Sequence, residues 1–224
     1  MSTLLLRLAA PLQAWGSDSR FETRRTGREP TKSGVIGLLA AALGRSRADS
    51  VDDLCQLRFG VRVDQEGQLL RDFHTAHQGD KTAYVSERYY LSDAAFLVGL
   101  ESEDSELLQK LEQALRAPVF PLFLGRRSCP PTLPIALGIR EGGLVDALKK
   151  EPWLASQWMQ RLYREKPLLR LMTDSGCGGR NMGMQRDLPV TFHISARSYA
   201  YREMEEYLPI APPDVLHDPM TELT

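Results

Sequence analysis

Residues 20–34 carry the side chains whose types and spacing are best suited to holding an anion. The segment reads RFETRRTGREPTKSG and places clustered cations and three threonines before a helix expected at Ser33–Leu43. A helix start offers free N–H groups and a positive dipole end, which attract phosphate. The segment therefore predicts polyanion binding, with a solvated basic loop as the alternative. The candidate residues are Arg20, Arg24, Arg25, Thr26, Arg28, Thr31, Lys32, Ser33 and Gly34. A nucleotide P-loop is excluded because Thr31 stands where that motif needs glycine before the lysine.

A second candidate is the segment LGRRSCPP at residues 124–131. Here an expected strand runs into a glycine turn, two arginines and a rigid proline pair. Guanidinium forks and turn backbone suit a phosphate or a base. The candidate residues are Gly125, Arg126, Arg127 and Ser128. A surface turn with two exposed arginines fits the sequence equally well.

A third set, His74, His77, Lys81 and Tyr84, has the residue types for metal-independent RNA cleavage. Such cleavage needs a base for the 2′-hydroxyl proton and an acid or cation for the leaving group. Two histidines in a hairpin are more often surface or structural residues. A metal site is disfavoured because no third His or Cys lies nearby, so no metal and no catalytic residue is expected.

Two weaker patterns complete the candidates. Residues 176–183 read GCGGRNMG, but Asn181 breaks the GxGxxG dinucleotide pattern, so a flexible loop is expected. Tyrosines beside arginines can stack unpaired bases, although most strand tyrosines are half-buried packing. The tyrosines concerned are Tyr84, Tyr89, Tyr90, Tyr199 and Tyr201.

Hydrophobic periodicity predicts the elements that must position these residues. Up to residue 124 the expected order is strand, helix, strand, long hairpin, strand, helix, strand. The expected strands are Thr3–Leu8, Leu57–Val63, Gln68–Thr75, two pieces within Tyr84–Leu100, and Val119–Leu124, with helices at Ser33–Leu43 and after a Ser102 cap. This order predicts an α+β, ferredoxin-like (RRM-like) β-α-β-β-α-β core with an inserted hairpin.

The second half of the chain is less regular. Helices are expected at 143–151 and 153–163, strands at Leu168–Met172, Pro189–Ile194 and Tyr199–Met204, and an irregular proline-rich tail after that. We expect residues 1–137 to form the core and residues 138–224 to form an extension packed on the same domain.

Composition suggests an ordinary globular chain. The 224 residues carry a net charge of −1, a sum that taken alone disfavours a polyanion partner. The sum hides a gradient, because residues 1–47 hold eight basic and three acidic side chains, whereas residues 203–224 hold six acids and no Lys or Arg. No apolar run is long enough for a bilayer, the N-terminus does not resemble a signal peptide, and three scattered cysteines form no disulfide framework. A cytoplasmic location without membrane contact is expected.

Several of these segments together resemble CRISPR-associated protein family five, most closely its subtype I-E members. The matching stretches are LRLAAPLQAWG at 6–16, REPTKSG at 28–34, GLL at 37–39, RDFHT at 71–75, RYYL at 88–91 and LGRRSCP at 124–130. Several separate motifs in the right order make the resemblance specific, although it is thin between residues 138 and 185.

The resemblance implies a repeat-associated (RAMP) fold with a thumb-like hairpin, at about Thr75–Ser92 here. It implies a subunit of Cascade, the RNA-guided CRISPR surveillance complex of antiviral defence, that grips the 5′ handle of the guide RNA (crRNA). It would contact the backbone and large subunits, meet target DNA only indirectly, and need no cofactor. Gln13, His74, Arg88 and Tyr89 lie in the matching motifs and join the RNA-binding candidates. In subtype I-E another subunit cuts the guide precursor, so this chain is expected not to be an enzyme. A metal-independent endoribonuclease that processes repeat RNA is the alternative.

Overall fold

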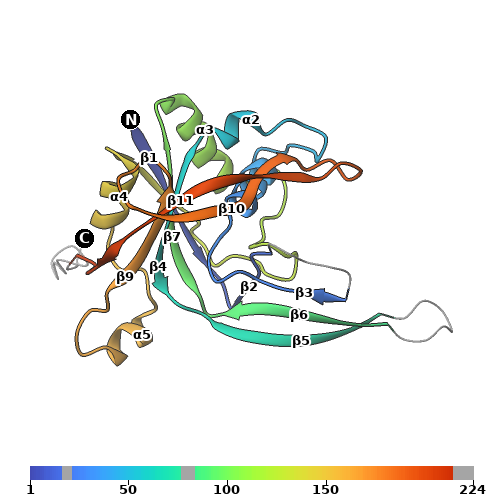
Figure 1. Cartoon of the computed structure of the whole chain (residues 1–224), viewed down its shortest axis with the longest axis horizontal. Coiled ribbons are helices and arrows are strands. Elements are labelled where there is room, and N and C mark those ends of the chain that lie inside the picture. The colour runs from blue at the N-terminus through green and yellow to red at the C-terminus, as the bar shows by residue number, and fades with distance from the viewer. Residues whose placement is uncertain (17–21, 77–83, 214–224) are drawn as a thin grey trace.

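A seven-stranded antiparallel sheet is the frame of the molecule (Figure 1). The structure is a computed structural model that describes residues 1–16, 22–76 and 84–213. Along the sheet the strands are β10 (Arg180–Thr191), β11 (Ser198–Ile210), β9 (Leu169–Asp174), β4 (Arg58–Gln65), β7 (Ala95–Ser102), β1 (Ser2–Ala9) and β8 (Ala136–Glu141). Strands from both halves of the chain therefore share one sheet, and the protein is a mixed α/β structure.

A smaller sheet is built around β6 (Tyr84–Ser92). Its other strands are β5 (Gln68–Ala76), β2 (Leu12–Gln13) and β3 (Thr23–Arg24), the last of which runs parallel to β6. The helices are α1 (Lys32–Ala42), α2 (Asp52–Cys55), α3 (Ser105–Arg116), α4 (Leu144–Lys150) and α5 (Gln157–Leu162). In the part of the chain that the structure describes, no helix is long and apolar enough to cross a membrane.

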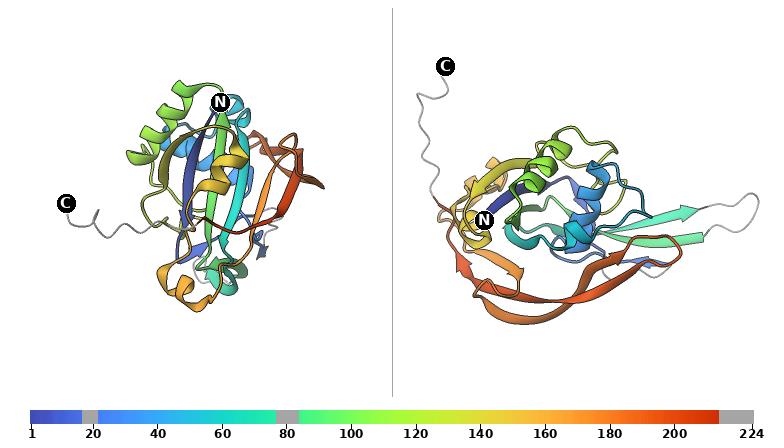
Figure 2. Two further views of the ribbon diagram at one scale, coloured as in Figure 1. Left: turned by 90° about the vertical axis from the view of Figure 1, so that its left-hand side faces the viewer. Right: turned by 90° about the horizontal axis from the view of Figure 1, so that it is seen from above.

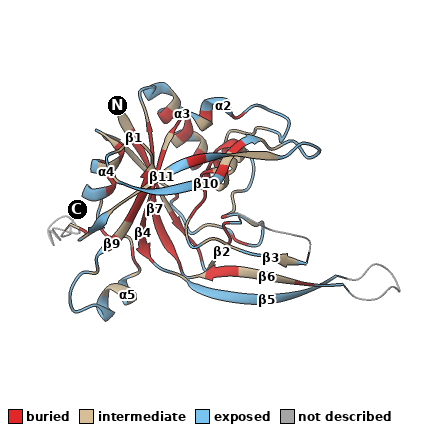
Figure 3. Cartoon of the chain, in the orientation of Figure 1, coloured by how far each residue is buried: buried red, intermediate tan, exposed pale blue. Residues whose placement is uncertain are grey.

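The central strands of the large sheet, β4, β7 and β1, are buried on both faces, whereas β10 and β11 at one edge are mostly exposed or half-buried (Figure 3). Leu4, Leu6 and Leu8 of β1 pack in the core that includes α1 and α3. Leu5 points to the other face and packs with Leu144 and Leu148 of α4. A strand buried on both sides becomes a nearly continuous apolar run, which explains the leucine run at residues 4–6.

The predicted strand at Val119–Leu124 is wrong, and β8 takes its place in the sheet. That segment does not join the sheet, because its backbone caps the C-terminal end of α1. The N–H groups of Val119 and Phe120 donate to the carbonyls of Ala42 and Ala41 at 3.0 and 3.3 Å. Both side chains are exposed. The last carbonyls of a helix lack partners within the helix, and an extended segment satisfies them here.

Other predicted elements of the first half are confirmed, with shifts at their ends. The helix α1 begins at Lys32, and Thr31 is its N-cap. The predicted Ser102 cap of α3 is wrong, because Asp104 Oδ1 accepts from the N–H of Leu107 at 2.9 Å. The hairpin is longer than expected, since β5 begins at Gln68 and pairs with β6 over nine residue positions. Residues 77–83 lie outside the described residues.

The C-terminal half is more regular than expected. Both predicted helices and all three predicted strands form. Two strands are longer than predicted: β10 begins at Arg180, within the expected flexible loop, and β11 continues to Ile210, within the expected irregular tail. The glycine-rich turn before β10 is held by Glu205, whose carboxylate accepts from the N–H groups of Gly176, Cys177 and Gly179 at 2.8–3.1 Å. The β10–β11 hairpin projects toward the same end of the molecule as β5–β6 (Figures 1 and 2).

Candidate nucleic-acid interface

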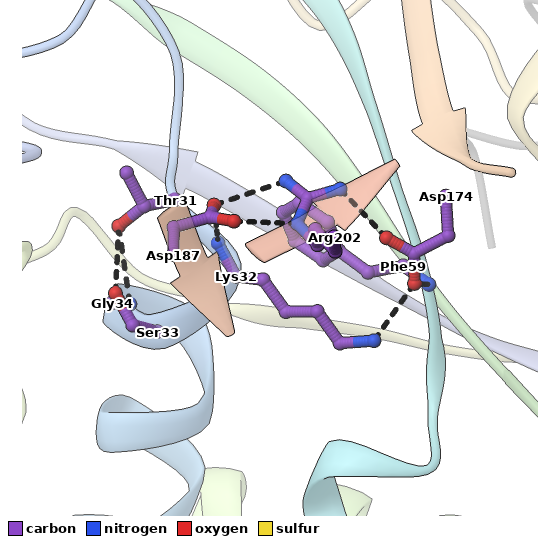
Figure 4. A network of polar contacts seen from close by, with 8 residues as sticks. All are labelled: Thr31, Lys32, Ser33, Gly34, Phe59, Asp174, Asp187 and Arg202. Carbon is purple, nitrogen blue, oxygen red and sulfur yellow. Dashed lines mark hydrogen bonds and ion pairs between the residues drawn. The ribbon is translucent and has the colours of Figure 1, made fainter. Parts of the chain in front are cut away.

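The N-terminus of α1 is already occupied by a carboxylate from the same chain. Asp187 Oδ2, on β10, accepts from the N–H of Lys32 at 2.8 Å, and Thr31 Oγ1 accepts from the N–H of Gly34 at 3.2 Å (Figure 4). These donors were predicted to bind phosphate. That prediction is wrong because the protein supplies the anion itself.

Lys32 belongs to a buried ion-pair network rather than to a surface. Its Nζ lies 2.7 Å from Asp174 Oδ2, and its residue is 5% exposed. Arg202 joins the two carboxylates, at 2.6 Å from Asp174 Oδ1 and 2.6 Å from Asp187 Oδ1 (Figure 4). Burial alone would lower the pKa of Arg202, but Asp187 and Asp174 outweigh it and raise the pKa above its usual range. Two cations and two carboxylates give the network no net formal charge.

Sequence reasoning missed the residues that complete this network. Asp174, Asp187 and Arg202 come from three different strands. The predicted alternation of Val190, Phe192 and Ile194 places Asp187 on the opposite, outer face, whereas the structure buries Asp187 and exposes Val190 and Ile194. A buried carboxylate needs a partner, and that partner lies on the next strand.

Gln13 also lies inside the protein, with no exposed surface. Its amide donates to the carbonyls of Leu8 and Ala94 at 3.3 and 2.7 Å, and its Oε1 accepts from Trp15 Nε1 at 3.1 Å. Direct RNA contact through Gln13 is therefore excluded in this conformation. The bond to Gln13 Oε1 orients the buried ring of Trp15, which supports the loop.

The Trp15 ring in turn limits two further candidates. A Cβ on Gly34 would lie 2.9 Å from that ring, so glycine lets the first turn of α1 pack closely. Thr26 Oγ1 accepts from the N–H of Trp15 at 2.8 Å. Ser33, the remaining residue of the helix start, is half-buried, and its Oγ lies 3.4 Å from Thr31 Oγ1. Thr26, Ser33 and Gly34 therefore make contacts inside the loop and the start of α1.

Arg126 joins the two predicted anion sites into one. Its guanidinium donates to the carbonyls of Arg24 at 2.8 Å, Arg25 at 3.4 Å and Tyr89 at 3.0 Å, and its Cζ lies 4.6 Å from the centre of the Tyr90 ring. The turn at 125–128, β3 and β6 thus meet at a single side chain. Because these bonds use its donors, Arg126 holds the neighbouring arginines in place.

The turn that carries Arg126 requires glycine at position 125. Gly125 has φ of +84°, and a Cβ there would lie 1.6 Å from the carbonyl oxygen of Ala14. No side chain fits at that distance. Gly125 therefore sets the path of the turn that presents Arg127 and Ser128 to solvent.

Four exposed arginines around this junction have no carboxylate partner among the described residues. They are Arg24, Arg25, Arg28 and Arg127. Several arginines elsewhere are paired, as in Arg45–Asp53 at 2.5 Å and Arg170–Glu29 at 2.7 Å. Unpaired guanidiniums remain free to fork onto phosphate oxygens. Arg20, predicted with them, lies outside the described residues.

The middle of β6 contributes an arginine and two tyrosines. Arg88 lies opposite Asp72 of β5 and Arg24 of β3, and its buried Nε has no hydrogen-bond partner in the described part of the chain. Tyr89 is half-buried, and Tyr90 is buried. Burial would raise the pKa of Tyr90, but Ser128 and Arg126 outweigh it and lower the pKa below its usual value. The site is therefore electropositive.

The candidate cleavage residues do not assemble within the described chain. His74 is exposed on β5, with Nδ1 3.3 Å from Asp72 Oδ2, and Tyr84 is exposed at the start of β6. His77 and Lys81 lie outside the described residues. Across residues 1–16, 22–76 and 84–213, no group of three or more His, Cys, Asp or Glu side chains is placed to hold a metal ion.

Comparison with known proteins gives consistent matches over most of the chain. Residues 3–205 match the family model for CRISPR-associated protein (Cas_Cas5). The chain is 40% identical over 158 residues to the CRISPR system Cascade subunit CasD of Escherichia coli (strain K12), an alignment that covers 61% of this chain and 70% of that relative.

Two solved structures share the fold. A crystal structure of a Cas protein is 42% identical, with a TM-score of 0.71 over 94% of this chain and 100% of its own. A chain of a CRISPR RNA-guided surveillance complex is 30% identical, with a TM-score of 0.78 over 99% of this chain and 97% of its own.

Proposed function

The chain belongs to the CRISPR-associated protein family (Cas_Cas5), and from this membership we propose that it is a non-catalytic, guide-RNA-binding subunit of the Cascade surveillance complex. The observation that carries the proposal is the Arg126 junction, which gathers arginines without carboxylate partners from two distant segments. The positive charges of such a cluster repel one another, and this repulsion is relieved when an anion binds. The proposed ligand is the 5′ handle of the guide RNA.

Single-stranded RNA suits this surface because its phosphates and its splayed bases are both accessible. Arg24, Arg25, Arg28 and Arg127 bind phosphates. Arg88 contributes a further guanidinium from the middle of β6, and Tyr89 beside it stacks on or separates nucleotides. The remaining candidates are Ser128 in the turn and His74 on β5, together with Arg20, which lies outside the described residues.

The proposal includes the finer architecture. The neighbours β4-β7-β1-β8, with α1 between β1 and β4 and α3 between β7 and β8, support a ferredoxin-like RAMP core, and the β5–β6 hairpin is its thumb. That core extends to Glu141, the end of β8, rather than to the expected residue 137, and the strands that follow extend the same sheet. In the complex the chain contacts the backbone and large subunits, and it meets target DNA only through the guide. We place this activity in the cytoplasm.

The test is the salt dependence of handle binding by the full chain. Each phosphate contact to a single strand contributes a slope of roughly 0.7 in the logarithm of the binding constant against the logarithm of salt concentration. The variant Arg24→Gln/Arg25→Gln/Arg127→Gln should bind a handle oligoribonucleotide more weakly and with a shallower slope. The control Arg47→Gln removes an exposed arginine from a distant loop and should change neither. Unchanged affinity in the triple variant would refute the proposal.

A further inference from the structure

The β10–β11 hairpin carries arginines and tyrosines on the face that points away from α1. Arg202 and Asp187 point inward, into the network at the start of α1. Successive side chains of a strand point to opposite faces, so Tyr201 and Tyr199 lie on the outer face of β11. Arg186 Cζ is 6.0 Å from the Tyr201 ring centre, and Arg197 Cζ is 5.3 Å from that of Tyr199.

These arginines keep free donors. Arg186 Nε donates to the carbonyl of Tyr199 at 3.3 Å, and Arg197 Nε donates to the hydroxyl of Tyr199. Neither arginine forms an ion pair with any residue that the structure describes. Tyr201 is 59% exposed, so its ring is accessible to a ligand. Exposed aromatic rings beside unpaired guanidiniums are suited to stacking unpaired bases while the charge binds the backbone.

The buried network fixes the position of the β10–β11 hairpin and the direction in which it projects. Asp187 from β10 and Arg202 from β11 both bond within the buried network, which fastens the hairpin to the start of α1 (Figure 4). The tip, between Thr191 and Ser198, projects at the same end of the molecule as the β5–β6 hairpin (Figures 1 and 2). This end of the molecule is therefore where a single RNA strand can meet both hairpins.

We propose that the outer face of the β10–β11 hairpin, defined by Arg186, Arg197, Tyr199 and Tyr201, is a second contact surface for unpaired nucleotides of the guide RNA. This inference rests on the proposed function and extends the RNA footprint beyond the Arg126 junction. The tyrosine rings stack on bases, and the two arginines neutralise neighbouring phosphates. The surface reads no particular sequence, because every base has a face that can stack.

The experiment is photo-cross-linking in the complex assembled from the full chain, its partner subunits and a guide RNA with 4-thiouridine at one position at a time. Peptides that contain Tyr199 and Tyr201 should cross-link at one or more positions. In the variant Tyr199→Leu/Tyr201→Leu that yield should fall about fivefold or more, the loss expected for one stacked base. Tyr163→Leu, which removes an exposed tyrosine next to α5, is the matched control and should leave the yield unchanged.

The identity of the cross-linked peptides distinguishes the possible outcomes. Cross-links confined to residues 22–28 and 124–129 would overturn this inference and leave the proposed function standing. Cross-links to neither region would remove both. Cross-links from the hairpin only to a photoreactive target DNA strand would also overturn it. If the tyrosine variant fails to assemble, Arg186→Gln/Arg197→Gln retains both rings, and its cross-link yield must fall for the inference to hold.

Discussion

Arginine side chains differ in this protein chiefly by what they bond. Arg202 is buried against two carboxylates, Arg126 donates to three backbone carbonyls, and Arg24 and Arg127 are exposed without a carboxylate partner among the described residues. The guanidinium forms planar forks that suit carboxylate, carbonyl or phosphate oxygens alike. The partner that each arginine finds within the protein therefore decides whether it is left free for an external anion.

Replacing Arg126 tests its positioning role. We expect Arg126→Ala to weaken handle binding more than Arg180→Ala, because only Arg126 fixes the backbone at Arg24 and Arg25. Arg126→Lys should fail to restore binding, since an ammonium group cannot span these separate carbonyls as a guanidinium does. Titration of a handle oligoribonucleotide measures both effects. Equal losses for Arg126→Ala and Arg180→Ala would contradict this role.

At the scale of elements, the buried network ties the two halves of the chain together. It joins the start of α1 to the end of β9 and to the interior of β10 and β11, and Phe59 of β4 donates its N–H to Asp174 at 3.0 Å. The hairpin could not keep a fixed direction without such an anchor, because it extends from the edge of the sheet. Burial makes the network sensitive to the loss of any one charge.

Asp187→Asn should destabilise the fold strongly. It removes one of the two carboxylates that neutralise Lys32 and Arg202, and breaking a buried pair by removing one partner typically costs about 3 kcal/mol or more. The unfolding free energy from urea denaturation should fall by about that amount. Arg116→Gln, which breaks an exposed pair with Glu112, is the control and should cost less than about 1 kcal/mol. Similar losses in the two variants would show that the network is not a structural anchor.

The hydrogen bonds of Glu205 in the turn before β10 should make the stability of the fold depend on pH in a specific way. The N–H groups of Gly176, Gly179 and Cys177 lower the pKa of Glu205 below its ordinary value. Ionised Glu205 therefore stabilises the fold above its unfolded-state pKa, roughly 4.3, and this contribution is lost as the pH falls through the lowered folded-state pKa. The difference in Tm between the protein and Glu205→Gln should be largest near neutral pH and shrink in acid. A difference that does not change with pH would contradict this role.

At the scale of the whole molecule, the net charge of −1 says little about the partner. The basic excess of the first 47 residues lies in part at the Arg126 junction, where Arg24, Arg25 and Arg28 are exposed. The acids near the C-terminus include Glu205, which is used in a turn. Binding depends on where charge lies rather than on its sum, so a neutral total is compatible with an RNA-binding face.

An RNA-binding subunit without catalytic function should leave its substrate intact. Incubation of the full chain with labelled repeat RNA, without metal, should give no cleavage, while a short RNA of uniform length should co-purify with the assembled complex. Cleavage that is lost in His74→Ala would favour the endoribonuclease alternative. Absence of a uniform RNA from the complex would count against guide binding itself.

The amino-acid sequence by itself determined the order of the core elements as far as α3 and the segments that carry basic side chains, but it placed the last core strand at Val119–Leu124 instead of Ala136–Glu141. The pattern of buried residues is visible directly in the sequence, as in the leucines of β1. The motifs at residues 6–16 and 124–130 identified the family. Only the tertiary structure decided how individual residues are used. Asp187 and Arg202 meet the start of α1 from strands more than 150 residues away in the chain, and Arg126 reaches β3 across about 100 residues. Such contacts depend on how strands are arranged in space, which periodicity does not encode. The helix start predicted to hold phosphate therefore holds an aspartate of the same chain instead.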